Sequence, residues 1–433
     1  MTIRSADAVV IGAGVIGCSV ALELARGGQR VVVVDRGPAA GAGSTSASAA
    51  IIRYSYSTPD AILTAWEAAA MWRDWAGHLG GVDPDGMATF VDCPNLTFRT
   101  TGYEPDAMLA HWREFGIDYE ELDAADLARR FPALDIGRYF PPKPVDDPAF
   151  ADDPAGELSA ILSPDCGFVD DPMLAARNLA WAARQHGAEF AFRAEVVAIE
   201  RDEAVRGVTL ADGTSISAPV VVNVGGPHSS LLNRLAGVTD DMTIGHRPLR
   251  QEVFVVPAPA GTGLDEGGAF VADLDLGQYF RPQPGGSMMI GSTEPECDEL
   301  VWVDDPDENS PYPTVDVWET AMLRFARRVP EFRVPNAPTG LASLYDVADD
   351  WVPIYDRSTL PGYFMACATS GNQFKNAPIA GAFMRAIIDA VSAGHDHDAE
   401  PVRFVGPRTG REIDLGAFSR RRTRAVTTNS VLG

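Results

Sequence analysis

Lysine is almost absent from this 433-residue chain, because only Lys143 and Lys375 occur and the other 33 of its 35 basic residues are arginine. Against these 35 cations stand 60 aspartate and glutamate residues, so the formal net charge is −25. A chain this acidic repels phosphate backbones and anionic lipid surfaces. We therefore expect neither a nucleic-acid partner nor a polybasic membrane contact.

Long apolar runs and paired cysteines are missing too. No uninterrupted run of about 18 apolar residues occurs, so a transmembrane helix is not expected, and a strand-like run from Ala8 leaves no room for a signal peptide. The five cysteines are scattered and contain no Cys-x-x-Cys pair. This pattern predicts reduced thiols in a cytoplasmic protein, without a disulfide framework or a metal site.

Basic residues cluster only near the end of the chain, at Arg420, Arg421, Arg422 and Arg424. We interpret this run as a solvated tail. The overall composition, with 46% hydrophobic and 22% charged residues, is that of a globular protein with two or three core-sized units.

The strongest motif is a dinucleotide fingerprint in the first 36 residues. An apolar strand over 8–11 leads into Gly12-x-Gly14-x-x-Gly17, a helix over 15–26 follows, and a second strand ends at Asp35. Glycines at these positions let the backbone approach a pyrophosphate at the helix N-terminus, and the acid suits a ribose hydroxyl. The fingerprint alone does not separate FAD from NAD, but no second copy is present for an additional nicotinamide domain.

Further along, three small-residue loops adjoin predicted α/β elements, which suits a long cofactor. They read GAGSTSASAAIIR over 41–53, NVGGPH over 223–228 and TSGNQFK over 369–375. We also predict a helix over 62–79 whose tryptophans face the core, and a strand over 190–200. Segments over 251–256, 269–281 and 287–290 predict an antiparallel sheet, and two acidic stretches at 146–157 and 294–313 predict surface loops.

Taken in order, these motifs resemble the D-amino-acid oxidase superfamily of flavoproteins, in its sarcosine, dimethylglycine and glycine oxidase branch. PDCGFVDDPMLAARNLAWAARQHGAEF, YDVADDWVPIYD, GYFMACATSGNQFKNAPIAGAFMRAII and IDLGAFSRRR also match. The resemblance implies an α/β fold, with a Rossmann-like FAD-binding domain of discontinuous segments and an α+β substrate domain with an antiparallel sheet. The implied FAD domain comprises 1–80, 160–226 and 339–433; the implied substrate domain comprises 81–159 and 227–338.

The resemblance also assigns site residues. Arg53 and Lys375 match the pair that holds the substrate carboxylate, although a structural ion pair is the alternative for Arg53. The implied FAD contacts are Gly12, Gly14, Val15, Ile16, Gly17, Asp35, Arg36, Ser44, Thr45, Ser46, Ala50, Val196, Val197, Gly225, Gly226, Ser370, Gly371, Asn372, Gln373, Phe374 and Lys375.

Several family positions differ here. Ser343 and Ser46-Ala47 stand where relatives carry the cysteine or histidine that attaches FAD covalently, so we predict non-covalent FAD. Ala50 replaces a flavin-facing basic residue. Met289 replaces the lysine that promotes reaction with oxygen, and Thr293 replaces a substrate-site histidine. Arg247, Arg250 or Arg281 could supply the missing cation, whereas His228 and His246 are interpreted as structural.

The resulting hypothesis is a FAD-dependent oxidoreductase that removes a hydride from the carbon next to nitrogen in a secondary or N-methylated amino acid, giving an imine that hydrolyses. The alternative keeps the fold but takes a non-amino-acid amine or a carrier-bound substrate, with an acceptor other than oxygen. The third hypothesis is an NAD-dependent dehydrogenase. The substrate side chain, the oligomeric state and any partner subunit stay open.

Overall fold

A six-stranded sheet forms one end of the protein. The computed structural model describes residues 5–433. The strand order is β19 (Ile354–Arg357), β20 (Tyr363–Cys367), β13 (Val220–Asn223), β1 (Ala8–Ile11), β2 (Val31–Asp35) and β9 (Glu189–Phe192). Only β19 runs antiparallel to its neighbour. The carboxyl ends of five parallel strands therefore meet along one edge, where ligands of such folds bind.

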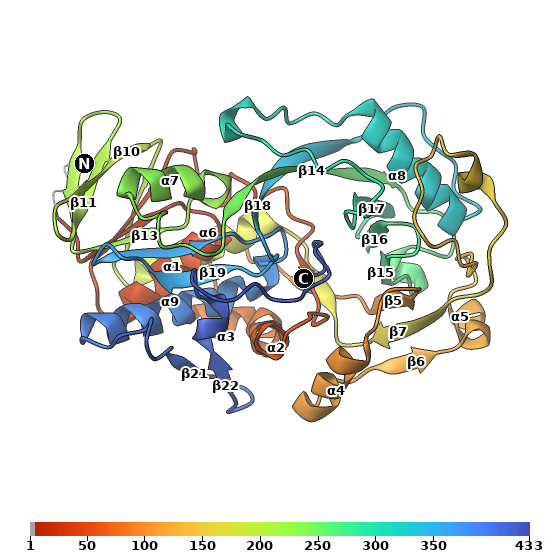
Figure 1. The fold of residues 1–433 in the computed structure, drawn as a ribbon, viewed down its shortest axis with the longest axis horizontal. Helices are drawn as coiled ribbons and strands as arrows, with labels where there is room; N and C mark the ends of the chain where they lie inside the picture. The colour runs from red at the N-terminus through yellow and green to blue at the C-terminus, as the bar shows by residue number, and fades with distance from the viewer. Residues whose placement is uncertain (1–4) are drawn as a thin grey trace.

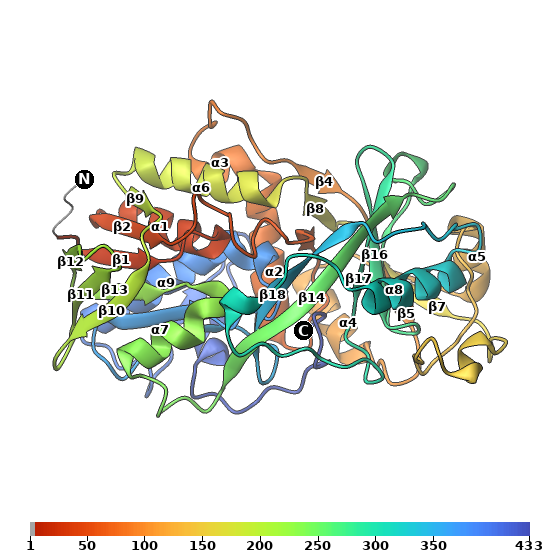
Figure 2. The same cartoon turned by 90° about the horizontal axis from the view of Figure 1, so that it is seen from above.

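Both faces of this sheet are covered, which explains why its central strands β13, β1 and β2 are valine-rich runs rather than alternating patterns. Helices α1 (Val15–Arg26), α6 (Pro172–Gln185) and α9 (Ala377–Ser392) share one apolar core with one face. A three-stranded sheet of β10 (Val196–Arg201), β11 (Val205–Leu210) and β12 (Ser215–Ser217), with α7 (Ser229–Ala236), packs on the other. The doubly covered α/β arrangement is visible on the left of Figures 1 and 2.

An eight-stranded, mostly antiparallel sheet forms the other end. Its order is β18 (Gly340–Ala348), β14 (His246–Pro257), β17 (Ser287–Ser292), β16 (Gln278–Gln283), β15 (Phe270–Asp273), β5 (Asn95–Arg99), β7 (Ser159–Ser163) and β6 (Glu120–Leu122). The predicted antiparallel sheet is thereby confirmed. Helices α5 (Ala124–Arg130) and α8 (Val315–Arg328) contribute to its core.

Smaller elements complete the fold. The remaining helices and strands are α2 (Pro59–Arg73), α3 (Trp75–Leu79), α4 (Asp106–Phe115), the sheet of β3 (Ile51–Ile52), β8 (Gly167–Val169) and β4 (Phe90–Asp92), and the pair β21 (Arg403–Val405) and β22 (Glu412–Asp414). The long strands β14 and β18 extend from one end toward the other, and the C-terminus lies between the two ends (Figures 1 and 2). The predicted domain boundaries stay a prediction.

Two predicted elements are wrong in detail. The helix predicted over 62–79 starts at Pro59 and breaks at Asp74, whose carboxylate caps α3 by accepting a hydrogen bond from the Gly77 amide (3.1 Å). The strand predicted over 190–200 is split into β9 and β10, because Arg193 adopts a positive φ of 55° between them. The predicted burial of Trp66, Trp72 and Trp75 is confirmed.

The arginine run is not the solvated tail that the sequence predicted. Arg420 is fully buried and pairs with Asp241 (2.6 Å), Asp356 (3.0 Å) and Asp398 (2.8 Å). Asp356 belongs to β19, so this cluster ties the end of the chain to the six-stranded sheet. By contrast, Arg421 is exposed.

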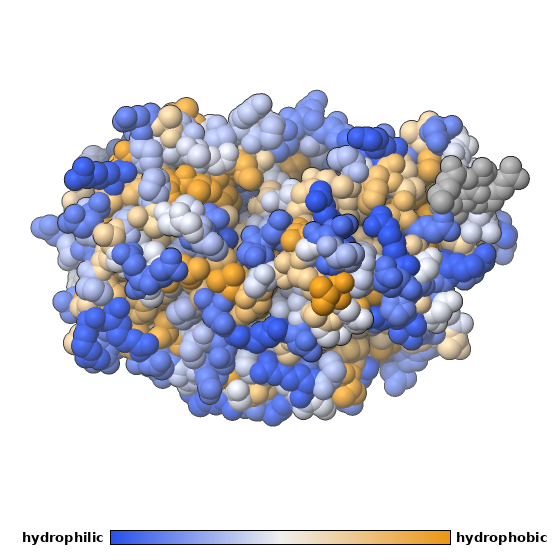
Figure 3. Space-filling view, turned by 180° about the vertical axis from the view of Figure 1, so that it is seen from behind, coloured by the Kyte–Doolittle hydropathy of each residue, from blue (hydrophilic) through white to orange (hydrophobic). Residues whose placement is uncertain are grey.

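The face seen in Figure 3 has hydrophilic residues spread over it with hydrophobic ones between them.

Replacing Arg420 with methionine should destabilise the protein by about 3–5 kcal/mol, because three buried or half-buried carboxylates would lose their cation. Denaturant unfolding of the FAD-loaded protein measures this change. The matched control is Arg421→Met, which should cost less than about 1 kcal/mol. Equal effects of the two substitutions would contradict the assignment of Arg420 as a buried structural cation.

Candidate functional site

The fingerprint glycines form a close backbone cradle at the start of α1. Gly12 has a φ of +112°, and a Cβ there would lie 2.2 Å from the carbonyl oxygen of Val224. A Cβ at Gly17 would lie 2.0 Å from the carbonyl oxygen of Gly12. Gly14 is the N-cap of α1 and supplies no side-chain cap, and no acid occupies the first turn with Val15 and Ile16. This helix N-terminus therefore fits the pyrophosphate of a dinucleotide.

Asp35, at the carboxyl end of β2, holds the loops beside this cradle. Its two carboxylate oxygens accept hydrogen bonds from the amides of Ala13 and Gly37, both at 2.6 Å. The Ala194 amide donates to the Asp35 carbonyl (2.8 Å), which brings the start of β10, with Val196 and Val197, to the same edge. Each carboxylate oxygen keeps a second lone pair for a ribose hydroxyl.

Arg36, a predicted cofactor contact, belongs to an exposed ion-pair cluster at the end of β2. Its guanidinium pairs with Asp307 at 2.7 Å, and His228 contacts the same carboxylate at 3.0 Å. The Arg36 guanidinium is the main reason why the pKa of Asp307 lies below its usual range. This exposed cluster connects the ends of β2 and β13 to the second acidic stretch.

The other predicted cofactor segments gather at the same sheet edge. The Thr45 hydroxyl accepts a hydrogen bond from the Val15 amide (3.1 Å), and the Ser44 hydroxyl donates to the carbonyl of Leu344 in β18 (2.8 Å). Ser46, which is exposed, bonds only within its own loop. Gly225 and Gly226 follow β13, and Ala50 adopts a φ of +50° directly before β3.

The loop from Ser370 to Lys375 is buried and tightly constrained. Ser370 and Gly371 both adopt positive φ, and a Cβ on Gly371 would lie 2.3 Å from the ring of Tyr345. Gln373 bonds to neighbouring side chains of the loop, and Phe374 stacks on Trp72 with ring centroids 5.2 Å apart. Their side chains therefore fix the loop, and the backbone of the loop is what remains for a cofactor.

Arg53 and Lys375 come together, as the resemblance predicted. The Arg53 guanidinium lies 5.1 Å and the Lys375 ammonium 5.3 Å from the centroid of the Tyr56 ring. Lys375 donates to the Tyr56 hydroxyl (3.2 Å) and to the Asn372 carbonyl (2.7 Å). Arg53 donates to the carbonyls of Ser55 and Val431. All of these acceptors are neutral.

These two cations have no carboxylate partner, whereas three of the other four buried lysine and arginine residues in the described chain do. Of the six buried basic residues in the described part of the chain, Arg324, Arg328 and Arg420 pair with aspartates, whereas Arg53, Arg281 and Lys375 have no carboxylate within 4.0 Å. Burial lowers the pKa of Arg53, and burial together with Arg53 holds the pKa of Lys375 well below its usual value. A buried cation pair of this kind is stabilised by an incoming anion.

The three alternative cations have different surroundings. Arg250 pairs with Glu252 at 2.9 Å, and Arg247 stacks on Trp302. Arg281 lies over the ring of Phe168 (3.7 Å) and reaches toward the sulfur of Met289 (3.9 Å), and burial lowers its pKa to about 10. Arg281 is thus a buried cation beside Met289, the position at which the resemblance implies a lysine in the family.

His246, which the sequence analysis interprets as structural, lies between side chains of two other strands. Its Nδ1 lies 2.7 Å from a carboxylate oxygen of Asp346, and its Nε2 lies 3.9 Å from the sulfur of Cys367. The other Asp346 oxygen accepts the Ala368 amide (2.6 Å). The group therefore fixes β14, β18 and β20 to one another. All five cysteines are free.

Sequence reasoning missed three parts of the site. Tyr56 lies three residues after Arg53, just outside the loop motif at 41–53. Both Arg53 and Lys375 lie close to its ring. Glu294 lies in a segment predicted as a surface loop, yet one of its carboxylate oxygens is buried without a hydrogen-bond partner. The chain end at 427–433 packs beside Arg53 and Tyr56. The rarity of lysine in the sequence pointed to Lys375, but no sequence pattern pointed to these three parts of the site.

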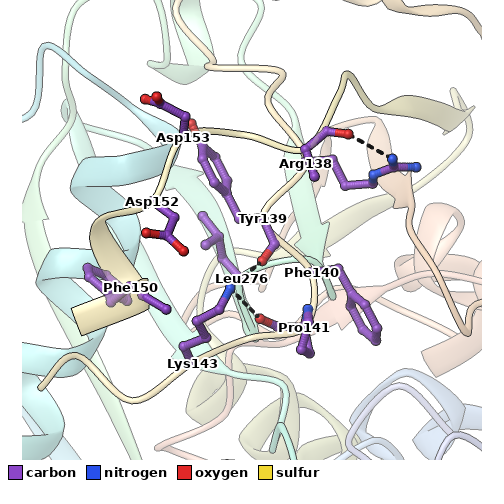
Figure 4. Close-up of a pocket in the computed structure, with 11 residues that line it drawn as sticks. Arg138, Tyr139, Phe140, Pro141, Lys143, Phe150, Asp152, Asp153 and Leu276 are labelled. Atoms are coloured by element: carbon purple, nitrogen blue, oxygen red, sulfur yellow. Dashed lines mark hydrogen bonds between the residues drawn. The ribbon is translucent and has the colours of Figure 1, made fainter. Parts of the chain in front are cut away.

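A separate hollow of about 140 Å³ lies in the other half of the molecule (Figure 4). Its lining includes the other lysine, Lys143, whose ammonium donates to the carbonyls of Tyr139 (3.2 Å) and Pro141 (3.5 Å). None of the predicted site residues lines it.

In the described part of the chain, no helix combines the length and apolar character needed to cross a membrane.

Comparisons with known proteins agree with this geometry. The family model of FAD dependent oxidoreductases (DAO) matches residues 7–387. FAD-dependent oxidoreductase domain-containing protein 1 of Xenopus laevis is 26% identical over 428 residues, covering 90% of this chain and 79% of that protein.

Two solved structures share the fold. Glycine oxidase from Geobacillus kaustophilus has a TM-score of 0.69 at 22% identity, covering 98% of this chain and 100% of that one. L-proline dehydrogenase from P. horikoshii has a TM-score of 0.69 at 20% identity, covering 91% and 95%. The cradle, the gathered loops and the family match lead to one conclusion: the chain belongs to the DAO family of FAD-dependent oxidoreductases.

Proposed function

We propose that this FAD-dependent oxidoreductase oxidises the carbon–nitrogen bond of a small amino acid, with sarcosine-like secondary or N-methylated amino acids as the preferred class. The observation that carries the proposal is the buried pair Arg53 and Lys375, which meets at Tyr56 without a carboxylate within salt-bridge distance. Two fixed cations hold a carboxylate in one orientation, which aligns the neighbouring carbon for reaction.

The roles of the chain's own residues follow from this arrangement. Arg53 and Lys375 bind the substrate carboxylate, and the Tyr56 hydroxyl orients the lysine. The backbone cradle at Gly12 to Gly17 would hold the FAD pyrophosphate, and the loop from Ser370 would lie beside the ring system. FAD supplies the acceptor for a hydride from the carbon next to nitrogen, and water then hydrolyses the resulting imine.

Similarity to a glycine oxidase and an L-proline dehydrogenase supports an amino-acid substrate. The second candidate is a dehydrogenase or tailoring enzyme of the same fold with an acceptor other than oxygen. The presence of Met289 where relatives carry a lysine favours it, although Arg281 lies beside that residue. Non-covalent FAD stays a prediction, based on Ser343 and Ser46.

Anaerobic addition of sarcosine, N,N-dimethylglycine, L-proline or glycine to the yellow FAD-loaded protein should bleach the flavin absorbance with at least one of the four. The FAD should also leave the protein on denaturation, as expected for a non-covalent cofactor. Admitting air afterwards measures how fast the absorbance returns, which separates an oxidase from a dehydrogenase. Failure of all four amino acids to bleach the flavin would refute the proposed substrate class.

A further inference from the structure

Glu294 and Arg53 hold the two ends of one peptide residue, Val431. The Val431 amide donates to the Glu294 carboxylate at 2.8 Å, and the Val431 carbonyl accepts from the Arg53 guanidinium at 2.8 Å. The backbone nitrogen, α-carbon and carbonyl of a residue are the same sequence of atoms as the amine, α-carbon and carboxyl of a free amino acid. Val431 therefore lies between one anion and one cation as a bound amino acid would.

The surroundings of Glu294 differ from those of a structural carboxylate. Its second carboxylate oxygen is buried and has no hydrogen-bond partner among the described residues. Its backbone adopts a φ of +53°, a conformation that residues other than glycine rarely take and that recurs at functional sites. No lysine or arginine in the described chain lies within 4.0 Å of its carboxylate. A buried, unpaired carboxylate is costly unless a ligand satisfies it.

Three titratable groups face this carboxylate. Tyr279 of β16 and Tyr345 of β18 both have pKa values raised by burial, so both stay neutral, and Asp298 pairs with Arg324 at 2.6 Å. Burial is the main reason why the pKa of Glu294 rises to about 8. The carboxyl group can therefore take up and release a proton near neutral pH, as a general base must.

The side chains around Val431 also suit a small substrate. Val431 and Leu432 are buried in an apolar cluster that includes Tyr279, Val347 and Trp351. Ser57 donates to the carbonyl of Gly433 (2.7 Å), which completes the docking of this segment. An amino acid placed like Val431 would direct its side chain toward apolar surface.

We propose that Glu294 is the amine-binding group of the substrate site, and that residues 427–433 occupy the position of an amino acid and leave it when substrate binds. This inference rests on the proposed function and extends it to the amine end of the substrate. The ionised Glu294 accepts a proton from the substrate ammonium and frees the nitrogen lone pair. That pair would form the second carbon–nitrogen bond of the imine as the carbon–hydrogen bond breaks and its electron pair leaves as hydride, for which FAD would supply the acceptor.

The first test compares Glu294→Gln with Glu296→Gln, an exposed acid two residues further along. The probes are propionate, which has a carboxylate but no amine, and sarcosine or whichever of the four amino acids bleaches the wild-type flavin fastest. In Glu294→Gln, the half-saturating concentration of the amino acid should rise at least about 30-fold, as expected for loss of a buried charge partner. Binding of propionate, followed by the flavin spectrum, should weaken less than threefold.

The pH profile adds a readout that a structural role would not change. In wild-type protein, the flavin reduction rate at low substrate should rise as pH increases through about 8, because Glu294 accepts a proton only when ionised. This rising limb of the pH profile should be absent from Glu294→Gln and present in Glu296→Gln. Unchanged amino-acid affinity in Glu294→Gln, or a retained limb, would overturn the proposal.

Hydrogen exchange tests the shared position. Saturating propionate should increase amide exchange in the peptide that contains 427–433, because the ligand takes the place of the Val431 carbonyl at Arg53. An unchanged rate of amide exchange in 427–433 at saturating propionate would overturn the proposal that these residues leave the site. Failure of the proposed function would look different, since wild-type protein would then bind neither propionate nor any of the four amino acids.

Discussion

Lys375→Met should weaken binding of propionate about 30-fold to 4,000-fold and raise the KM of the amino-acid substrate by a similar factor. The methionine keeps the apolar length of the side chain but removes one of the two cations that we assign to the carboxylate. Loss of one partner from a buried charge pair typically costs about 2–5 kcal/mol, which corresponds to this range. Titrations of the FAD-loaded protein followed by the flavin spectrum measure it.

The free energy of unfolding of this variant should not fall in step with its affinity for propionate. Burial holds the pKa of Lys375 well below its usual value, so the folded protein already disfavours the charged lysine. Removing that charge should therefore not lower the free energy of unfolding by the amount expected for a broken ion pair. The control is Lys143→Met, the only other lysine, which lies in the distant hollow. A Lys375→Met protein that binds propionate within threefold of wild type would contradict the assignment.

Gly14→Asp should yield a folded protein with about 1,000-fold weaker FAD binding. Gly14 has a φ of −67° and a ψ of 176°, which any residue can adopt, and aspartate is a favoured N-cap. The added carboxylate would occupy the helix N-terminus and repel the pyrophosphate. Two like charges about 4 Å apart near a protein surface repel by about 4 kcal/mol, which sets the expected factor.

The matched control for this variant is Gly14→Asn, which has the same shape without the charge. Both side chains would place a Cβ 3.2 Å from the Thr45 hydroxyl, so both require the same small adjustment. FAD affinity measured by fluorescence titration of the apoprotein should fall less than tenfold in the asparagine variant. Equal losses in the two variants would show that size, rather than charge, limits binding at this helix end.

Local patterns were enough to predict the elements that form the backbone cradle. The fingerprint from Gly12 to Asp35 requires only a strand, a glycine turn, a helix and a second strand in sequence order, and α1 occupies 15–26 as predicted. The proximity of Arg53 and Lys375 came from the family resemblance, because 322 residues separate them and no periodicity connects them.

The features that the sequence did not predict depend mostly on contacts between distant segments. Arg420 resembles a tail residue in sequence, and only the fold brings Asp241, Asp356 and Asp398 around it. Glu294 lies in an acidic stretch that is typical of a surface loop, and its burial follows from the packing of 427–433 on β16 and β18. Asp74 breaks the predicted helix because its carboxylate binds the Gly77 amide, a local competition that apolar spacing does not reveal.

A crystal structure of the FAD-loaded protein with bound propionate tests the central claim most directly. We expect the carboxylate of propionate within hydrogen-bond distance of both the Arg53 guanidinium and the Lys375 ammonium, with Val431 displaced from Arg53. Propionate bound elsewhere, with Val431 still bonded to Arg53 and Lys375 still directed only at Tyr56 and Asn372, would contradict it.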